Sequence, residues 1–244
     1  MDSRTRYSLP PVVSPDSPAF TDPSYSSIEP GTVWESRGDY GDIRYEVSTG
    51  DDAGIAKITI NRPQKRNAIS DTLIRQIHTA AVNLPEEARV LVLSGEGDHF
   101  CAGLDLSEMD ERSTFEGVFH SRMWHAAMDA LQFGRVPIVA VLHGAVVGGG
   151  LELASSAHIR VAEDSTFYGL PEGQRGLFVG GGGSARVPRL VGFSRMTDMM
   201  LTGRVLDADE GQAVGLSHYR VKDGAGLAKG VELAKKIAAN APLS

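Results

Sequence analysis

Long apolar runs, cysteine and net positive charge are the features that this sequence lacks. No apolar run approaches the ~20 residues that a membrane-spanning helix needs, so no membrane partner is predicted. Cys101 is the only cysteine, which excludes an internal disulfide and favours a cytoplasmic location. The formal charge of -7 offers no basic surface for nucleic acid, and no apolar secretory signal follows the first residues.

The first 40 residues differ in composition from the rest. Six of the 12 prolines fall in the first thirty residues, mixed with Ser, Asp and Tyr. We interpret residues 1–40 as a flexible Pro/Ser-rich N-terminal arm and residues 41–244 as the core domain. Within that domain, strands and helices alternate, which predicts an α/β fold with a mostly parallel sheet. The expected strands are 43–47, 55–60, 90–93, 136–142, 159–162 and 216–221, and the expected helices are 71–84, 116–133, 184–190, 195–201, 209–214 and 227–239.

The centre of the chain is an apolar run, Val136 to Leu142, followed by the glycines Gly148 to Gly150 and a Leu- and Ala-rich segment. A strand, a glycine turn and a helix in succession leave unpaired backbone N–H groups at the helix start. These groups and the helix dipole favour negative charge there. Glu152 lies in the first turn of the same helix, so this stretch combines an oxyanion-binding amide with a carboxylate.

Four short motifs occur in order along the chain. They are Asn61-Arg62-Pro63 with Asn67-Ala68, Phe100 to Leu106, Gly144 to Glu152, and Pro171-Glu172. With these motifs the segment from Ile43 to Ser244 resembles the enoyl-CoA hydratase/isomerase (crotonase) superfamily. The resemblance implies a crotonase-like spiral of ββα units that assembles as a homotrimer or a dimer of trimers.

The same resemblance implies chemistry on an acyl-CoA thioester. The backbone N–H groups of Leu104 and Gly149 would form an oxyanion hole for the thioester oxygen, because preorganised amide donors stabilise the charge of an enolate. Glu152 and Glu172 would be the catalytic acid/base pair that adds water across the Cα–Cβ double bond. The implied activity is therefore that of an enoyl-CoA hydratase.

Contacts to coenzyme A carry over from the family to a set of residues in two of the motifs. They are Lys65, Arg66, Ala68, Ala102, Leu104, Asp105 and Leu106. No metal site and no separate cofactor are expected, since coenzyme A is part of the substrate. The family continues with further C-terminal helices, so the resemblance implies that the C-terminal helical region is truncated after Ser244.

Other interpretations stay open at this point. The enzyme alternatives are an enoyl-CoA isomerase and a hydratase-lyase acting on an aromatic enoyl-CoA; the non-enzymatic one is an acyl-CoA-binding protein. Gly180, Gly182 and Ala185 fit a dinucleotide-binding pattern, although the apolar run before them is short for a strand. No G-x-S-x-G elbow supports a serine hydrolase. Arg62 to Arg66 is either a solvated basic turn or a segment that faces a phosphate.

Overall fold

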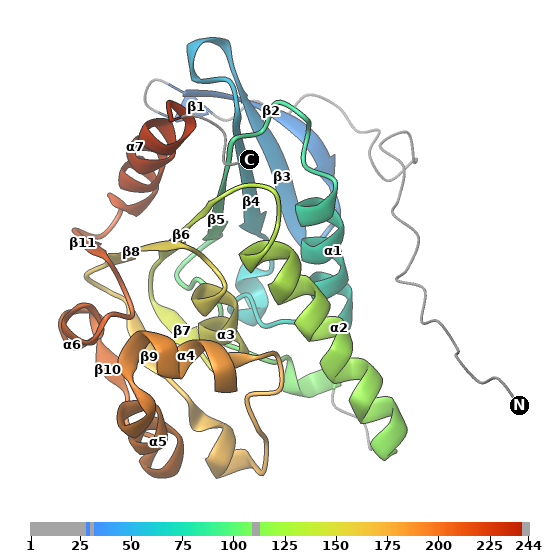
Figure 1. Ribbon diagram of the computed structural model, residues 1–244, viewed down its shortest axis with the longest axis vertical. Coiled ribbons are helices and arrows are strands. Elements are labelled where there is room, and N and C mark those ends of the chain that lie inside the picture. Colours follow the sequence, from blue (N-terminus) through green and yellow to red (C-terminus); the bar gives the residue numbers. More distant parts are fainter. Residues whose placement is uncertain (1–27, 30–31, 109–112, 241–244) are drawn as a thin grey trace, which may run out of the picture.

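A long mixed sheet and a short second sheet organise the fold (Figure 1). The computed structural model describes residues 28–29, 32–108 and 113–240. The strands of the long sheet are β1 (Ile28–Glu29), β2 (Thr32–Asp39), β3 (Ile43–Thr49), β4 (Ile55–Ile60), β5 (Val90–Gly95), β6 (Ile138–Leu142), β8 (Ile159–Glu163) and β11 (Tyr219–Val221). Within the described residues they follow the order β1-β2-β3-β4-β5-β6-β8-β11. Pairing is antiparallel from β1 to β4 and parallel from β4 to β11.

The second sheet contains the short strands β7 (Ala145–Val147), β9 (Phe167–Gly169) and β10 (Leu206–Asp207), in the order β10-β9-β7. A parallel bridge between Cys101 and Val146 extends this layer, and a bridge between Ile69 and Leu104 extends it further. Strands β4, β5, β6 and β8 are thus each followed by a short extended segment and then by a helix. This is the ββα spiral that the resemblance implied. This second layer is not predictable from the sequence, because two- and three-residue strands carry no periodic pattern.

Helices cover both faces of the long sheet. The helices among the described residues are α1 (Asp71–Val82), α2 (Thr114–Gln132), α3 (Gly149–Ser155), α4 (Gly183–Val191), α5 (Phe193–Thr202), α6 (Ala208–Val214) and α7 (Gly226–Ala238). Helices α1 and α2 pack together on one face, and α7 covers β5, β6 and β8 on the other. The side chain of Ser70 accepts a hydrogen bond from the Leu73 amide and caps α1.

Strand β5 shows why a short, continuous apolar run forms a strand here. Successive side chains point to opposite faces of a strand. Leu91 and Leu93 therefore enter the core under α1 and α2, whereas Val90 and Val92 enter the smaller core under α7. All four side chains are fully buried. A strand covered on both faces needs apolar residues at every position.

The expected boundary of the arm at residue 40 is wrong. Residues 32–39 form β2, which pairs with β3, and the buried Trp34 side chain belongs to the same core cluster as Ile55 and Val90. The alternation of buried Thr32 and Trp34 with exposed Val33 is that of a sheet strand with one solvated face. Residues 1–27 and 30–31 of the predicted arm and the chain end at 241–244 lie outside the described residues.

Candidate functional site

The glycine turn that the sequence placed at the centre lies between β7 and α3. Gly148 has a φ of +54°, which an L side chain rarely adopts, and a Cβ atom there would lie 2.9 Å from Glu172 Oε1. Helix α3 begins at Gly149, whose N–H has no partner in the preceding turn. Among the described residues, no hydrogen bond uses this amide. It is therefore available to an acceptor.

The Leu104 amide reaches the same place from another segment. In the bridge between Ile69 and Leu104, the Ile69 N–H donates to the Gly103 carbonyl at 2.7 Å and the Asp105 N–H donates to the Ile69 carbonyl at 2.9 Å. Both bonds involve neighbours of Leu104, so its own N–H points away from Ile69. A Cβ atom built on Gly149 would lie 3.6 Å from the Leu104 nitrogen. The two predicted oxyanion amides therefore lie side by side.

Glu152 is held by backbone donors from a distant loop. Its Oε1 atom accepts hydrogen bonds from the Gly181 amide at 2.9 Å and the Gly183 amide at 2.8 Å, and only 3% of the residue is exposed. Its other oxygen, Oε2, accepts no hydrogen bond from the residues that the structure describes. One oxygen thus fixes the carboxyl group while the second remains for a water or a substrate.

Glu172 comes from a 3-10 turn, η5 (Pro171–Arg175), that follows β9. The side chain is buried, and its Oε2 atom has no hydrogen-bond partner among the described residues. An unsatisfied buried oxygen is costly, which makes it a natural acceptor or donor site for a bound molecule. Glu172 and Glu152 line the same cavity.

The two carboxyl groups affect one another. Burial raises the pKa of Glu152 to about 7, and the charge of Glu172 adds to the rise, while the amides of Gly183 and Gly181 oppose it. Burial also raises the pKa of Glu172. The charge of Glu172 is one of the causes that raise the pKa of Glu152, and interacting acids titrate as a pair. A pair of this kind is suited to both giving and taking a proton.

The cavity that contains these groups has a volume of about 400 Å³. Trp124 of α2 forms its wall beside the glycines, because a Cβ atom on Gly149 or Gly181 would lie within 3.0 Å of the indole ring. Ala102, Asp105 and Leu106 also line the cavity. From the predicted set, the structure thus brings together Ala102, Leu104, Asp105, Leu106, Gly149, Glu152 and Glu172.

Three residues of the predicted coenzyme A set lie outside the cavity lining. Lys65 and Arg66 are exposed, and the Lys65 ammonium donates a hydrogen bond to Ser107 at 3.1 Å beside the cavity. Ala68 offers its carbonyl to Arg62 instead. Asp105 lines the cavity, but its carboxylate is engaged by Arg62 and by Ser107, whose hydrogen bonds are the main reason that its pKa is lowered.

The glycines at 180–183 do not behave as a dinucleotide loop. The amides of Gly181 and Gly183 donate to Glu152, and no strand spans the residues before them. A Cβ atom on Gly183 would lie 2.6 Å from the Glu152 Cγ atom, so the close approach of this side chain requires glycine. The glycine-rich loop was visible in the sequence, but its partner was not.

A family model for enoyl-CoA hydratase/isomerase matches residues 50–244. The chain belongs to the enoyl-CoA hydratase/isomerase family. Among curated members of this family, it is 37% identical over 211 residues to the mitochondrial enoyl-CoA hydratase domain-containing protein 2 of Bos taurus, covering 83% of this chain and 71% of that protein. It is 33% identical over 193 residues to the short-chain-enoyl-CoA hydratase of Clostridium acetobutylicum, covering 78% of this chain and 74% of that one.

Solved structures of family members share the fold. A protein of Rhodopseudomonas palustris CGA009 described as a candidate enoyl-CoA hydratase is 51% identical, with a TM-score of 0.79 over 84% of this chain and 78% of that chain. The enoyl-CoA hydratase of Bacillus anthracis is 31% identical, with a TM-score of 0.76 over 82% of this chain and 78% of that chain. No helix among the described residues has the length and apolar character to span a bilayer.

Proposed function

We propose that this family member is an enoyl-CoA hydratase that adds water across the Cα–Cβ double bond of an enoyl-CoA thioester. The observation that carries the proposal is the meeting of four groups in one cavity. The backbone amides of Leu104 and Gly149, which have no hydrogen-bond partner among the residues that the structure describes, lie beside two buried carboxyl groups, Glu152 and Glu172. Amides of this kind suit a developing oxyanion, and the acids suit proton transfer.

The amides would bind the thioester oxygen. When water attacks Cβ, negative charge moves through Cα to that oxygen, and the N–H groups of Leu104 and Gly149 would stabilise it. A preorganised donor of this kind is commonly worth about 3 kcal/mol in the transition state. Because the glycine at 149 begins a helix, the dipole of α3 adds to the stabilisation.

The acids would move the protons. One carboxylate takes a proton from the attacking water as the water oxygen bonds to Cβ. The pair of acids delivers a proton to Cα, so that one water molecule is consumed. Glu152, held at Oε1 by Gly181 and Gly183, can hold the water through Oε2. The coupled titration of the pair makes a joint assignment of these roles appropriate.

Outside the cavity, the protein would bind the substrate through contacts to its coenzyme A part. Lys65, which contacts Ser107, and Arg66, whose carbonyl accepts a hydrogen bond from the Ala102 amide, are both exposed cations, which suits them to the phosphates of coenzyme A. Ala102 to Leu106 would line the path of the pantetheine arm. We further propose that the chain assembles as a homotrimer or a dimer of trimers. A cytoplasmic location stays a prediction.

The test is a panel of enoyl-CoA esters with short, long and aromatic acyl groups. We expect loss of the enoyl-thioester absorbance of crotonyl-CoA and a 3-hydroxyacyl-CoA product. Migration of the double bond would instead identify an isomerase, and release of acetyl-CoA from an aromatic ester would identify a hydratase-lyase. Binding of every ester without turnover would leave only an acyl-CoA-binding role. The presence of both carboxyl groups favours hydration, since isomerisation needs only one.

A further inference from the structure

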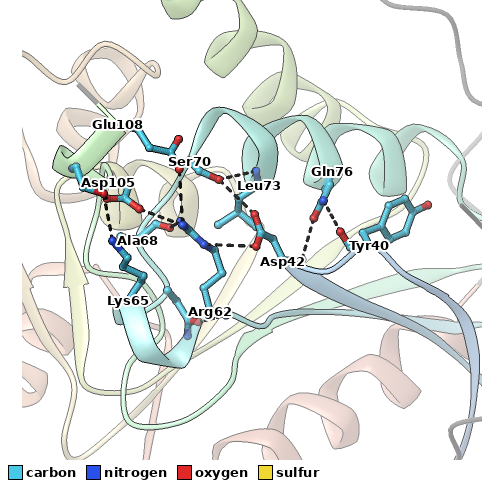
Figure 2. A network of polar contacts seen from close by, with 12 residues as sticks. Tyr40, Asp42, Arg62, Lys65, Ala68, Ser70, Leu73, Gln76, Asp105 and Glu108 are labelled. Carbon is cyan, nitrogen blue, oxygen red and sulfur yellow. Dashed lines mark hydrogen bonds and ion pairs between the residues drawn. The ribbon is translucent and has the colours of Figure 1, made fainter. Parts of the chain in front are cut away.

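Arg62 is a buried cation at the centre of a polar network next to the oxyanion amides (Figure 2). Only 11% of its side chain is exposed. Its guanidinium lies 3.0 Å from the Asp105 carboxylate, 3.4 Å from Asp42 and 3.7 Å from Glu108, and it donates to the Ala68 carbonyl. Neither interpretation of the basic turn, as a solvated segment or as a phosphate contact, describes this residue. A buried guanidinium that is paired with several carboxylates binds other parts of the protein and not a solvent-exposed ligand.

The two partners of Arg62 that matter most flank the bridge that orients Leu104. Ala68 precedes Ile69, and Asp105 follows Leu104, and Ile69 and Leu104 are the two bridge partners. By binding the Ala68 carbonyl and the Asp105 carboxylate together, the guanidinium joins the two segments. The bonds Ile69 N–H to Gly103 and Asp105 N–H to Ile69 are then held in register.

Further contacts make this arrangement rigid. The Asp105 carboxylate also accepts hydrogen bonds from the amide and the hydroxyl of Ser107, at 3.1 Å and 2.6 Å. Asp42 accepts a hydrogen bond from Ser70, the residue that caps α1, at 3.3 Å. Arg62 therefore connects the start of α1, the turn before β3 and the loop that carries Leu104.

We infer that Arg62 is a positioning residue that fixes the Leu104 amide toward the thioester oxygen; this rests on the proposed function. A planar guanidinium carries five N–H donors in fixed directions, whereas the lysine ammonium is a compact group with three rotatable donors. A lysine at this position keeps the charge but cannot hold Ala68, Asp105 and Asp42 together. Arg62→Lys should therefore weaken oxyanion stabilisation while leaving coenzyme A recognition in place.

The first measurement compares kcat and KM for crotonyl-CoA in Arg62→Lys, the wild type and a control. The control is Arg44→Lys, which changes an arginine paired with Glu96 away from the cavity. For Arg62→Lys we expect kcat to fall by about 10–10²-fold with KM changed by less than about 3-fold, a smaller loss than that of a whole oxyanion donor. The control should keep both constants. A melting temperature reports folding for each variant.

The second measurement is independent of hydration. Butyryl-CoA labelled with ¹³C at the carbonyl cannot be hydrated, and its ¹³C shift when bound reports hydrogen bonding to the thioester oxygen. We expect a downfield shift in the wild type and a partial return toward the free value in Arg62→Lys at full occupancy. If Arg62→Lys folds poorly, Asp105→Asn should show the same return.

The outcomes separate the two proposals. A folded Arg62→Lys or Asp105→Asn with the wild-type kcat and carbonyl shift, even at a lower melting temperature, would show a purely structural role and overturn the inference. A wild type that shifts the carbonyl but does not hydrate crotonyl-CoA would refute hydration, while the carbonyl comparison still decides the role of Arg62. If the wild type binds butyryl-CoA without any carbonyl shift, no amide donates to the thioester oxygen. Arg62 would then have no oxyanion donor to position, and the inference would be overturned.

Discussion

The Oε1 atom of Glu152 accepts a hydrogen bond from the Gly183 amide at 2.8 Å, across 31 residues of sequence. The Gly181 amide donates to the same oxygen. The glycine-rich loop therefore orients a carboxyl group whose pKa burial raises to about 7. Orientation and a pKa near neutrality are the two properties that a general acid or base needs.

Removing either carboxyl group should abolish most of the turnover. Glu152→Gln and Glu172→Gln keep the size and part of the hydrogen bonding of each side chain but cannot take up a proton. We expect each to reduce kcat for crotonyl-CoA by ~10²–10⁴-fold while acyl-CoA affinity stays largely intact. Stopped-flow absorbance and calorimetric titration with butyryl-CoA measure the two quantities. Near-normal hydration by either variant would refute its assignment.

Glu152 should also make stability depend on pH. Its pKa is raised from 4.5 to about 7, so the folded protein holds this proton more tightly than the unfolded chain. The contribution of this carboxyl group to the free energy of unfolding is therefore fully present below about pH 4.5 and is lost as the pH rises through about 7. Glu152→Gln should be more stable than the wild type at pH 8, by at most about 3 kcal/mol.

Urea unfolding at pH 5 and pH 8 checks this expectation, and the advantage of Glu152→Gln should shrink at pH 5. Asp198→Asn serves as the control, since this acid lies in the middle of α5 and does not line the cavity. An advantage of Glu152→Gln that is equal at both pH values would show that its origin is packing and not ionisation.

A methyl group at residue 183 should displace the catalytic carboxyl. In Gly183→Ala the new Cβ atom would lie 2.6 Å from the Glu152 Cγ atom, so the side chain must move. Misplacement by about 1 Å can cost roughly 10²-fold in rate, and we expect a loss of this order in kcat. Gly117→Ala is the control, because nothing lies within 4 Å of a Cβ there. It should keep kcat and gain about 1 kcal/mol in helix stability.

The exposed cations beside the cavity should act on substrate affinity alone. The double variant Lys65→Gln/Arg66→Gln should raise KM for crotonyl-CoA by roughly 3–10-fold at low salt, with kcat unchanged, because each exposed ion pair contributes little. Salt screens such pairs, so the difference should fade at 0.5 M NaCl. Lys229→Gln on α7 provides the control. Equal KM values for wild type and double variant at low salt would exclude a phosphate contact.

Much of the fold follows from local pattern. The apolar run at 90–93, the helix spacing after Ser70 and the glycines before Glu152 were each enough to place an element. These signals arise within a few residues, because side-chain periodicity and turn chemistry are local properties. The order of the four motifs led to the family, which the match over residues 50–244 then established.

Contacts between distant segments were not predictable in this way. Strand β2 joins the sheet by pairing with β3, and its Trp34 lies in the same buried cluster as residues of α7, at the other end of the chain. The Arg62 side chain sits in a polar, basic segment, yet it is buried because Asp42 and Asp105 converge on it from separate turns. No spacing in the sequence carries such information.

The sequence by itself determined which residues carry the candidate chemistry: the amides after Gly103 and Gly148, and the acids Glu152 and Glu172. Only the tertiary structure decided how they are held. The raised pKa of Glu152 and the pairing of Asp105 with Arg62 depend on burial and on neighbours far along the chain. The chemical groups are set by the residue types in each short motif. Their desolvation and hydrogen-bond geometry arise only when folding brings distant segments into contact.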